Sequence, residues 1–277
     1  MNPPTRTIVD QLEANSDTNR RGFISRIGMF GLGAASATGL LVACASDSTG
    51  PSGSPQLDQK IINAAATAEA LASVMYDNII KSSPTYAALA GAHADDQNYL
   101  AAGREQEAIH YMTLTGAGAK ALTTDFYFPS GMFTDTGFAT TINTLVTLED
   151  AFIAAYLIGI RDLSSDALKQ LAGQILGIEC EHRALARIIA ADLGLAGTKG
   201  LSGTAEPSAG AGRAPNNLAF ERTFSSSLKT IDDIVTALGP FVAAGSAGFD
   251  TTKFSFNTSA NFYVTETPTV TLDDTTP

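Results

Sequence analysis

Two Glu-x-x-His motifs, each preceded by a lone acid, are the residues of this chain best suited to chemistry. The motifs are Glu107–His110 and Glu179–His182, and the lone acids are Glu69 and Glu149. Residues three apart lie on one face of a helix, so each motif can aim its carboxylate and its imidazole at one point. The order Glu, Glu-x-x-His, Glu, Glu-x-x-His is the ligand set of a dinuclear carboxylate metal site inside a four-helix bundle.

A tyrosine follows each lone acid by seven residues, Tyr76 after Glu69 and Tyr156 after Glu149. Seven residues are about two helical turns, so each tyrosine shares a stripe with its acid. Tyr76 and Tyr156 could donate hydrogen bonds to the carboxylates or act as one-electron donors, or they could be ordinary core tyrosines. The repeated spacing predicts two similar helical hairpins in tandem, related by a pseudo-two-fold axis.

The polar residues of these motifs interrupt apolar helical stripes. Glu149 lies on one stripe with Leu145 and Phe152, and His182 lies on another with Ile178. A buried carboxylate is costly unless it is paired or bound to a cation. This cost favours metal ligands over incidental polar residues of the core.

Hydrophobic periodicity predicts an all-α fold. Caps and breakers bound four long helices, at about residues 57–82, 94–115, 135–161 and 165–193. Ser164 or Ser165 can cap the fourth helix, and Gly116 to Gly118 close the second. The connection at 119–134 is too long for a tight turn, and it fits the one long crossover of such a bundle.

The chain changes character after the four predicted helices. Residues 194–225 are rich in Gly, Pro and Ser and predict a loop, and a fifth helix is predicted at 226–245. Residues 246–277 contain alternating stretches such as Phe254-Ser255-Phe256, which favour extended structure. We expect an irregular or β-hairpin arm there.

The first 43 residues resemble an export signal. Arg20 and Arg21 open a stretch that resembles a twin-arginine signal, and the apolar run Ile27–Ala43 leads to Leu41-Val42-Ala43-Cys44, which resembles a lipobox. The run is short for a membrane span, which needs about 20 apolar residues, although a true anchor is the alternative. The favoured interpretation is cleavage before Cys44, acylation of Cys44, and a flexible tether at 44–56.

The chain contains two cysteines. If Cys44 carries lipid, Cys180 is alone and forms no disulfide within the chain, even in an oxidising compartment. Cys180 lies between Glu179 and Glu181, where it could be a redox group or a soft ligand. A small buried side chain is the favoured interpretation, since buried free cysteines are usually inert.

Composition limits the classes of partner. The formal net charge is −11, and 44% of the residues are hydrophobic. An acidic chain binds the phosphate backbone poorly, so we expect no nucleic-acid partner. The length fits one core domain with appendages.

Several segments together resemble the exported ferritin-like domain family, which includes the desiccation-related proteins of plants and bacteria. They are Thr67-Ala68-Glu69, Glu107-Ala108-Ile109-His110, Phe133-Thr134-Asp135 with Leu148-Glu149-Asp150, and Ile178-Glu179-Cys180-Glu181-His182-Arg183. The resemblance covers about residues 57–193 and retains all six ligand positions. It implies a ferritin-like four-helix bundle. One departure is Ala72, where relatives often carry a second acid.

The resemblance also implies how the ligands divide between two metal ions. Glu107 and Glu179 would bridge the ions, Glu69 and His110 would complete one, and Glu149 and His182 would complete the other. Four carboxylates balance two divalent cations, and oxygen with imidazole ligands suits two Fe or Mn ions.

Three functions follow from such a site. The first is a di-metal oxidase, peroxidase or catalase-like enzyme that uses O2 or peroxide in stress protection. The second is metal binding without turnover, and the third is a structural lipoprotein. The export features imply a periplasmic or cell-envelope location with a lipid anchor at Cys44, and the protein could form a homodimer.

Overall fold

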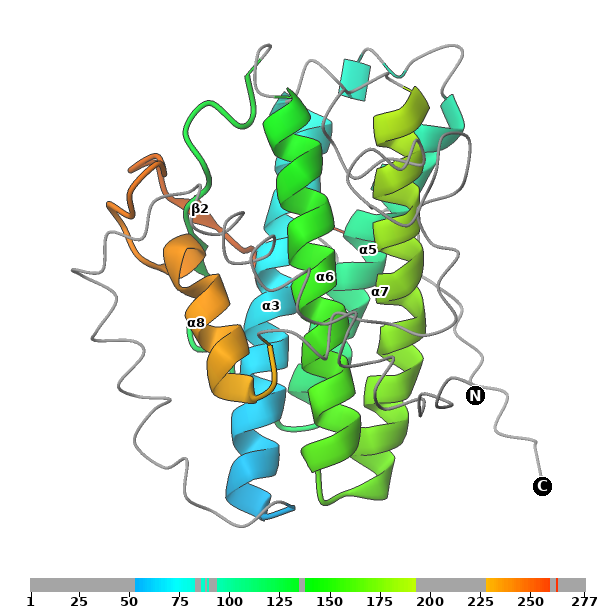
Figure 1. The fold of residues 1–277 in the computed structure, drawn as a ribbon, viewed down its shortest axis with the longest axis vertical. Helices are drawn as coiled ribbons and strands as arrows, with labels where there is room; N and C mark the ends of the chain where they lie inside the picture. Colours follow the sequence, from blue (N-terminus) through cyan, green and yellow to red (C-terminus); the bar gives the residue numbers. More distant parts are fainter. Residues whose placement is uncertain are drawn as a thin grey trace, which may run out of the picture.

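The computed structural model describes residues 53–82, 86–87, 89, 94–134, 138–192, 228–259 and 263. The predicted signal at 1–43, most of the tether and the loop at 194–225 lie outside these residues. Four long helices run side by side along the molecule (Figure 1). They are α3 (Pro55–Ser82), α5 (Ala94–Gly116), α6 (Phe138–Asp162) and α7 (Asp166–Asp192).

The helix ends follow local rules. Ser54 starts α3, because its hydroxyl accepts a hydrogen bond from the Leu57 amide at 3.2 Å, and Pro55 suits the first helical position. The helix therefore begins two residues before the predicted start and includes the end of the predicted tether. Gly118 follows α5 with a φ of +98°, the left-handed conformation that favours glycine at a helix end.

The helices pair as two hairpins. α3 packs against α5, and α6 packs against α7, with further contacts from α3 to α6 and from α5 to α7. By length and composition α6 could cross a bilayer, but 83% of its most apolar window is buried inside the bundle, as in the central helix of a globular core. The inner face of α3 is buried, and it contains Ile62, Ala65, Glu69, Ala72, Tyr76 and Ile79.

A carboxylate ties the ends of the two hairpins together. Asp58 on α3 accepts hydrogen bonds from the Ser164 amide at 2.7 Å and from the Ser165 amide at 3.3 Å. Ser165 also caps α7, because its hydroxyl accepts from the Leu168 amide at 3.4 Å. These contacts hold the first turn of α3 against the α6–α7 turn.

The crossover between α5 and α6 carries a short strand, β1 (Asp125–Phe126), which pairs antiparallel with β2 (Phe254–Ser255). The described part of the C-terminal arm therefore pairs with the crossover and does not form a hairpin with itself. Phe128 contacts the rings of Phe133, Phe241 and Phe254 at centroid distances of 5.2–6.1 Å. This aromatic cluster forms a second, smaller core beside the bundle.

The fifth helix, α8, spans Ile231–Val242, and it is shorter than predicted. Thr230 caps it, because the Thr230 side chain accepts from the Asp233 amide and the Asp233 side chain accepts from the Thr230 amide. This capping box sets the start at Ile231, so residues 228–230 are not helical. α8 packs on α3 and α6, and it lies beside the bundle in Figure 1.

Candidate metal centre

Six ionisable side chains meet in the middle of the bundle. Glu69 comes from α3, Glu149 from α6, and the two Glu-x-x-His motifs from α5 and α7. The side chains of all four glutamates are fully buried, and His110 and His182 are 8% and 3% exposed. The structure therefore brings together all six residues that the sequence pattern indicated.

Apolar neighbours on each helix force these side chains inward. On α3 Glu69 shares its buried face with Ala65, Ala72 and Tyr76, so turning Glu69 outward would expose that face. Residues three apart on α5 and on α7 point the same way, which places each glutamate beside its own histidine.

The ligand atoms form two overlapping groups. One contains Glu69, Glu107, His110 and Glu179, and the other contains Glu107, Glu149, Glu179 and His182, with ligand atoms in each group within 4.8 Å of one another. Glu107 and Glu179 belong to both groups. Each group has the size of one metal's ligand set, and the shared pair lies where bridging carboxylates would lie.

The imidazoles face the carboxylates through Nδ1. His110 Nδ1 is 3.3 Å from Glu179 and 3.4 Å from both Glu69 and Glu107. His182 Nδ1 is 2.9 Å from Glu107 and 3.4 Å from Glu179. Both rings thus direct the same nitrogen at the centre of the cluster.

Many atoms of this cluster make no well-aligned hydrogen bond. Both carboxylate oxygens of Glu107 and Glu179, one oxygen each of Glu69 and Glu149, and both Nδ1 atoms are buried without one among the described residues. A buried polar atom without a partner costs about 1–3 kcal/mol. Metal coordination would satisfy all of these atoms at once, so the donor set fits two oxygen- and nitrogen-ligated cations.

Charge crowding splits the pKa values of the carboxyls. Burial, followed by the charges of Glu179 and Glu69, raises the pKa of Glu107 well above its usual range. Burial also raises the pKa of Glu149 well above its usual range, although the charge of His182 opposes the rise. Burial pushes the pKa of Glu179 upward too, but contacts with His110 and His182 outweigh it and lower that pKa to about 2.

At the two histidines burial lowers the pKa, and the nearby carboxylates raise it. Burial alone would lower the pKa of His182, but contact with Glu179 and the charge of Glu149 raise it to about 9. Burial likewise opposes the charge of Glu69 at His110, and the pKa of His110 still rises well above its usual range. Without metal, these shifts favour an ionised Glu179 beside two protonated histidine rings.

Each tyrosine reaches the lone acid of the other hairpin. The Tyr76 hydroxyl donates to Glu149 Oε1 at 2.8 Å, and the Tyr156 hydroxyl donates to Glu69 Oε1. Burial, followed by nearby glutamate charges, raises the pKa of both phenols well above 10.0, so both hydroxyls keep their protons. Sequence spacing placed each tyrosine with its own acid, and packing of the two hairpins exchanges the partners.

Sequence reasoning missed one contact of the centre. The side-chain oxygen of Gln106 lies 2.8 Å from His182 Nε2, where it can accept the Nε2 proton and leave Nδ1 to face the carboxylates. Such outer contacts orient metal-binding histidines. The only sequence signal is that Gln106 adjoins Glu107. The equivalent position beside His110 in the repeat is Ile178, which cannot make this contact.

Cys180 is half-buried on α7 and belongs to neither ligand group. The structure therefore gives no support to Cys180 as a soft ligand of this centre. Glu179 and His182, one and two residues away from Cys180 in sequence, point into the bundle.

A comparison with known protein families agrees with this geometry. Residues 57–192 match the family described as a ferritin-like domain. These residues have the ferritin-like fold, an all-α bundle. A search of curated proteins found no match to the chain. The fold prediction is confirmed, and the centre of this ferritin-like domain carries buried carboxylate and histidine groups that could bind metal.

Proposed function

We propose that this ferritin-like protein holds a dinuclear Fe or Mn centre and carries out redox chemistry with O2 or peroxide after export to the cell envelope. The observation that carries the proposal is the set of eight buried donor atoms without well-aligned hydrogen bonds, from six side chains at one point. Oxygen and imidazole donors suit these metals better than they suit Cu(I) or a thiolate-type zinc site.

The two ligand groups divide the six residues between two ions. Glu69 and His110 would hold one ion, and Glu149 and His182 would hold the other. Glu107 and Glu179 are shared, so each can bridge. Four carboxylates with two neutral imidazoles carry the charge that two divalent cations neutralise.

Two bound Fe or Mn ions would supply electrons to O2 or peroxide. The protein's own residues orient the ligands and keep the centre dry. Tyr76 and Tyr156 remain protonated and fix one oxygen of Glu149 and of Glu69 by hydrogen bonds. These contacts leave the other oxygen of each carboxylate for an ion.

The space beside the centre favours a very small substrate. Two cavities touch the tyrosines, and the space open to the centre of a water-sized molecule is about 20 Å³ in one and about 10 Å³ in the other. About 10–15 Å³ holds a single water. Such cavities suit molecules of the size of O2 or peroxide better than an organic substrate.

Complete burial of the four carboxylates also fits a second function, a metal-binding or structural lipoprotein without turnover. Elemental analysis of protein from its native source tests metal binding, and about two Fe or Mn per chain is the result expected from the ligand set. Consumption of O2 or peroxide by that protein then separates the two functions. A folded protein without metal would refute the dinuclear centre.

Export is a separate part of the proposal. Arg20 and Arg21 with the lipobox at Cys44 support a twin-arginine signal and a lipid anchor. The mass of the mature protein tests this part, since cleavage before Cys44 and acylation give a defined new N-terminus. A mature protein that starts at Met1 would refute it.

A further inference from the structure

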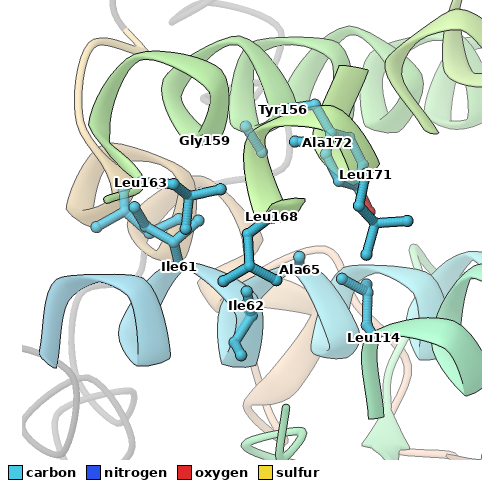
Figure 2. Close-up of a pocket in the computed structure, with 12 residues that line it drawn as sticks. Ile61, Ile62, Ala65, Leu114, Tyr156, Gly159, Leu163, Leu168, Leu171 and Ala172 are labelled. Atoms are coloured by element: carbon cyan, nitrogen blue, oxygen red, sulfur yellow. The ribbon is translucent and has the colours of Figure 1, made fainter. Parts of the chain in front are cut away.

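A small cavity lies where α8 meets the bundle (Figure 2). It lies on the side of the candidate metal centre where Tyr156 contacts Glu69. The volume that the centre of a water-sized sphere can occupy in this cavity is about 20 Å³. This volume is enough for one small molecule. Every lining residue except Tyr156 is aliphatic or glycine, and Ile231 of α8 forms part of the wall. Figure 2 shows Ile62, Leu168 and Ala65 facing the same space.

Tyr156 separates this cavity from the ligand cluster. Its ring lines the cavity, and its hydroxyl is engaged with Glu69. A buried water needs about two to four polar partners, and this lining offers none that is free among the described residues. The cavity therefore favours an apolar occupant, one aromatic ring away from a carboxylate of the candidate metal centre.

The tandem repeat produces a related cavity at the other end of the cluster. In the tandem repeat Glu149 is equivalent to Glu69, and Glu179 is equivalent to Glu107. The same two offsets in residue number also pair residues that line the two cavities. Tyr76, Leu100, Leu145 and Ala186 of the second cavity correspond in this way to Tyr156, Ala172, Ala65 and Leu114 of the first. The two hairpins thus build a cavity beside each tyrosine.

The two cavities differ in polarity and size. The second cavity is smaller, at about 10 Å³, and includes the ring of His182 and Tyr99, a residue that is 44% exposed. The cavity beside Tyr156 has no imidazole in its wall, and α8 covers it. This difference makes the Tyr156 cavity the apolar one of the pair.

We propose that the cavity beside Tyr156 is a binding site for one small apolar molecule of the size of O2. It would deliver an apolar co-substrate to the centre, whereas peroxide would lose its hydrogen bonds to water on entering and gain none from this lining. The link to turnover rests on the proposed redox function. Binding itself needs no metal, so it can be tested separately.

Gly159 allows the cavity to be filled without strain. A Cβ at this position would lie 3.6 Å from Ala172 and Leu163 and 3.7 Å from Ile61, which are ordinary contact distances. Gly177→Ala is the matched control, because Gly177 is exposed on α7 and a Cβ there meets nothing within 4 Å. Both substitutions replace a helical glycine by alanine, so the two variants share the same general effect on helix stability.

Xenon is a suitable apolar probe, and its binding to full-length protein can be followed by xenon NMR and located in crystals under xenon pressure. Wild-type protein and Gly177→Ala should bind xenon beside Tyr156, with or without metal. Gly159→Ala should bind it several-fold more weakly. Equal affinity in Gly159→Ala and wild type, or xenon found only beside His182, would overturn the assignment.

Kinetics of the metal-loaded protein separate this inference from the proposed function. Gly159→Ala should raise KM for O2 at unchanged kcat and leave peroxide consumption unaltered. Turnover of O2 without xenon binding would overturn the cavity site and leave the redox function standing. Xenon binding by a protein that takes up no metal would support the cavity as a binding site and overturn its link to turnover.

Discussion

In the metal-free protein, Glu179→Gln should be strongly destabilising at pH 6, whereas Glu107→Gln should be nearly neutral. The two glutamates occupy equivalent positions in the repeat, and both belong to both ligand groups. Their surroundings differ in charge, because contacts with His110 and His182 lower the pKa of Glu179, whereas burial and the charges of Glu179 and Glu69 raise the pKa of Glu107.

The expected loss at Glu179 follows from its pKa. Contacts with His110 and His182 hold that pKa at about 2, against an ordinary 4.5, and each pKa unit corresponds to about 1.4 kcal/mol. A lowered pKa in the folded state adds stability above the unfolded value, and that stability is lost as the pH falls toward 2. At pH 6 it is fully present, so Glu179→Gln removes up to about 3 kcal/mol, or about 6–12 °C in Tm.

Glu107→Gln should leave Tm within about 2 °C of wild type, as for a substitution that costs about 0.5 kcal/mol or less. Burial and the charges of Glu179 and Glu69 raise the pKa of Glu107, which favours its protonated carboxyl in the metal-free protein. A glutamine amide has the same shape and the same lack of charge. The variant therefore keeps the state that the metal-free cluster prefers.

Thermal unfolding of chelator-treated protein, followed by circular dichroism, measures both effects. The Glu179→Gln deficit should shrink at pH 10, above the pKa of about 9 of His182, because a neutral imidazole no longer needs the carboxylate. Both variants should lose metal binding, since both remove a shared ligand. Equal destabilisation by the two substitutions, or wild-type metal content in either, would refute this reasoning.

Four further predictions concern the same centre. Tyr156→Phe should cost about 1–3 kcal/mol in urea unfolding, because Glu69 Oε1 loses its donor; no loss would contradict that hydrogen bond. Gln106→Leu should weaken one of two Co2+ sites by about 10–100-fold in a titration, and two unchanged sites would exclude a role for the contact with His182. The raised pKa of His182, about 9, adds stability below pH 6.5 that is lost as the pH rises to 9, so Tm of the metal-free protein should fall over this range. Bound metal, which needs deprotonated ligands, should raise Tm more at pH 8 than at pH 6.

The helices could be predicted because their signals are local. The predicted end of the first helix at residue 82 and the closing segment Gly116–Gly118 agree within a residue with the observed ends of α3 and α5. The fifth helix is shorter than the prediction of 226–245, and the capping box between Thr230 and Asp233 explains its later start at Ile231. That box is itself a local sequence signal.

The strand pairing was not predictable by the same means. Phe254 and Phe256 indicated extended structure, but their partner strand at Asp125–Phe126 is far away in sequence. Pairing at this separation depends on where the crossover and α8 come to lie. Only packing of the whole chain decides it.

The sequence by itself determined which residues meet in the centre. Spacing of three puts Glu107 beside His110 and Glu179 beside His182 on any helix. Because an isolated buried charge is unfavourable, burial of these side chains favours an arrangement in which they contact one another. The tertiary structure decided how the surroundings of equivalent residues in the two hairpins differ. Packing of one hairpin across the other gives each tyrosine the acid of the opposite hairpin and places Gln106 against His182. It also lowers the pKa of Glu179 while raising that of Glu107. These differences depend on distances between helices, which no spacing along the chain encodes.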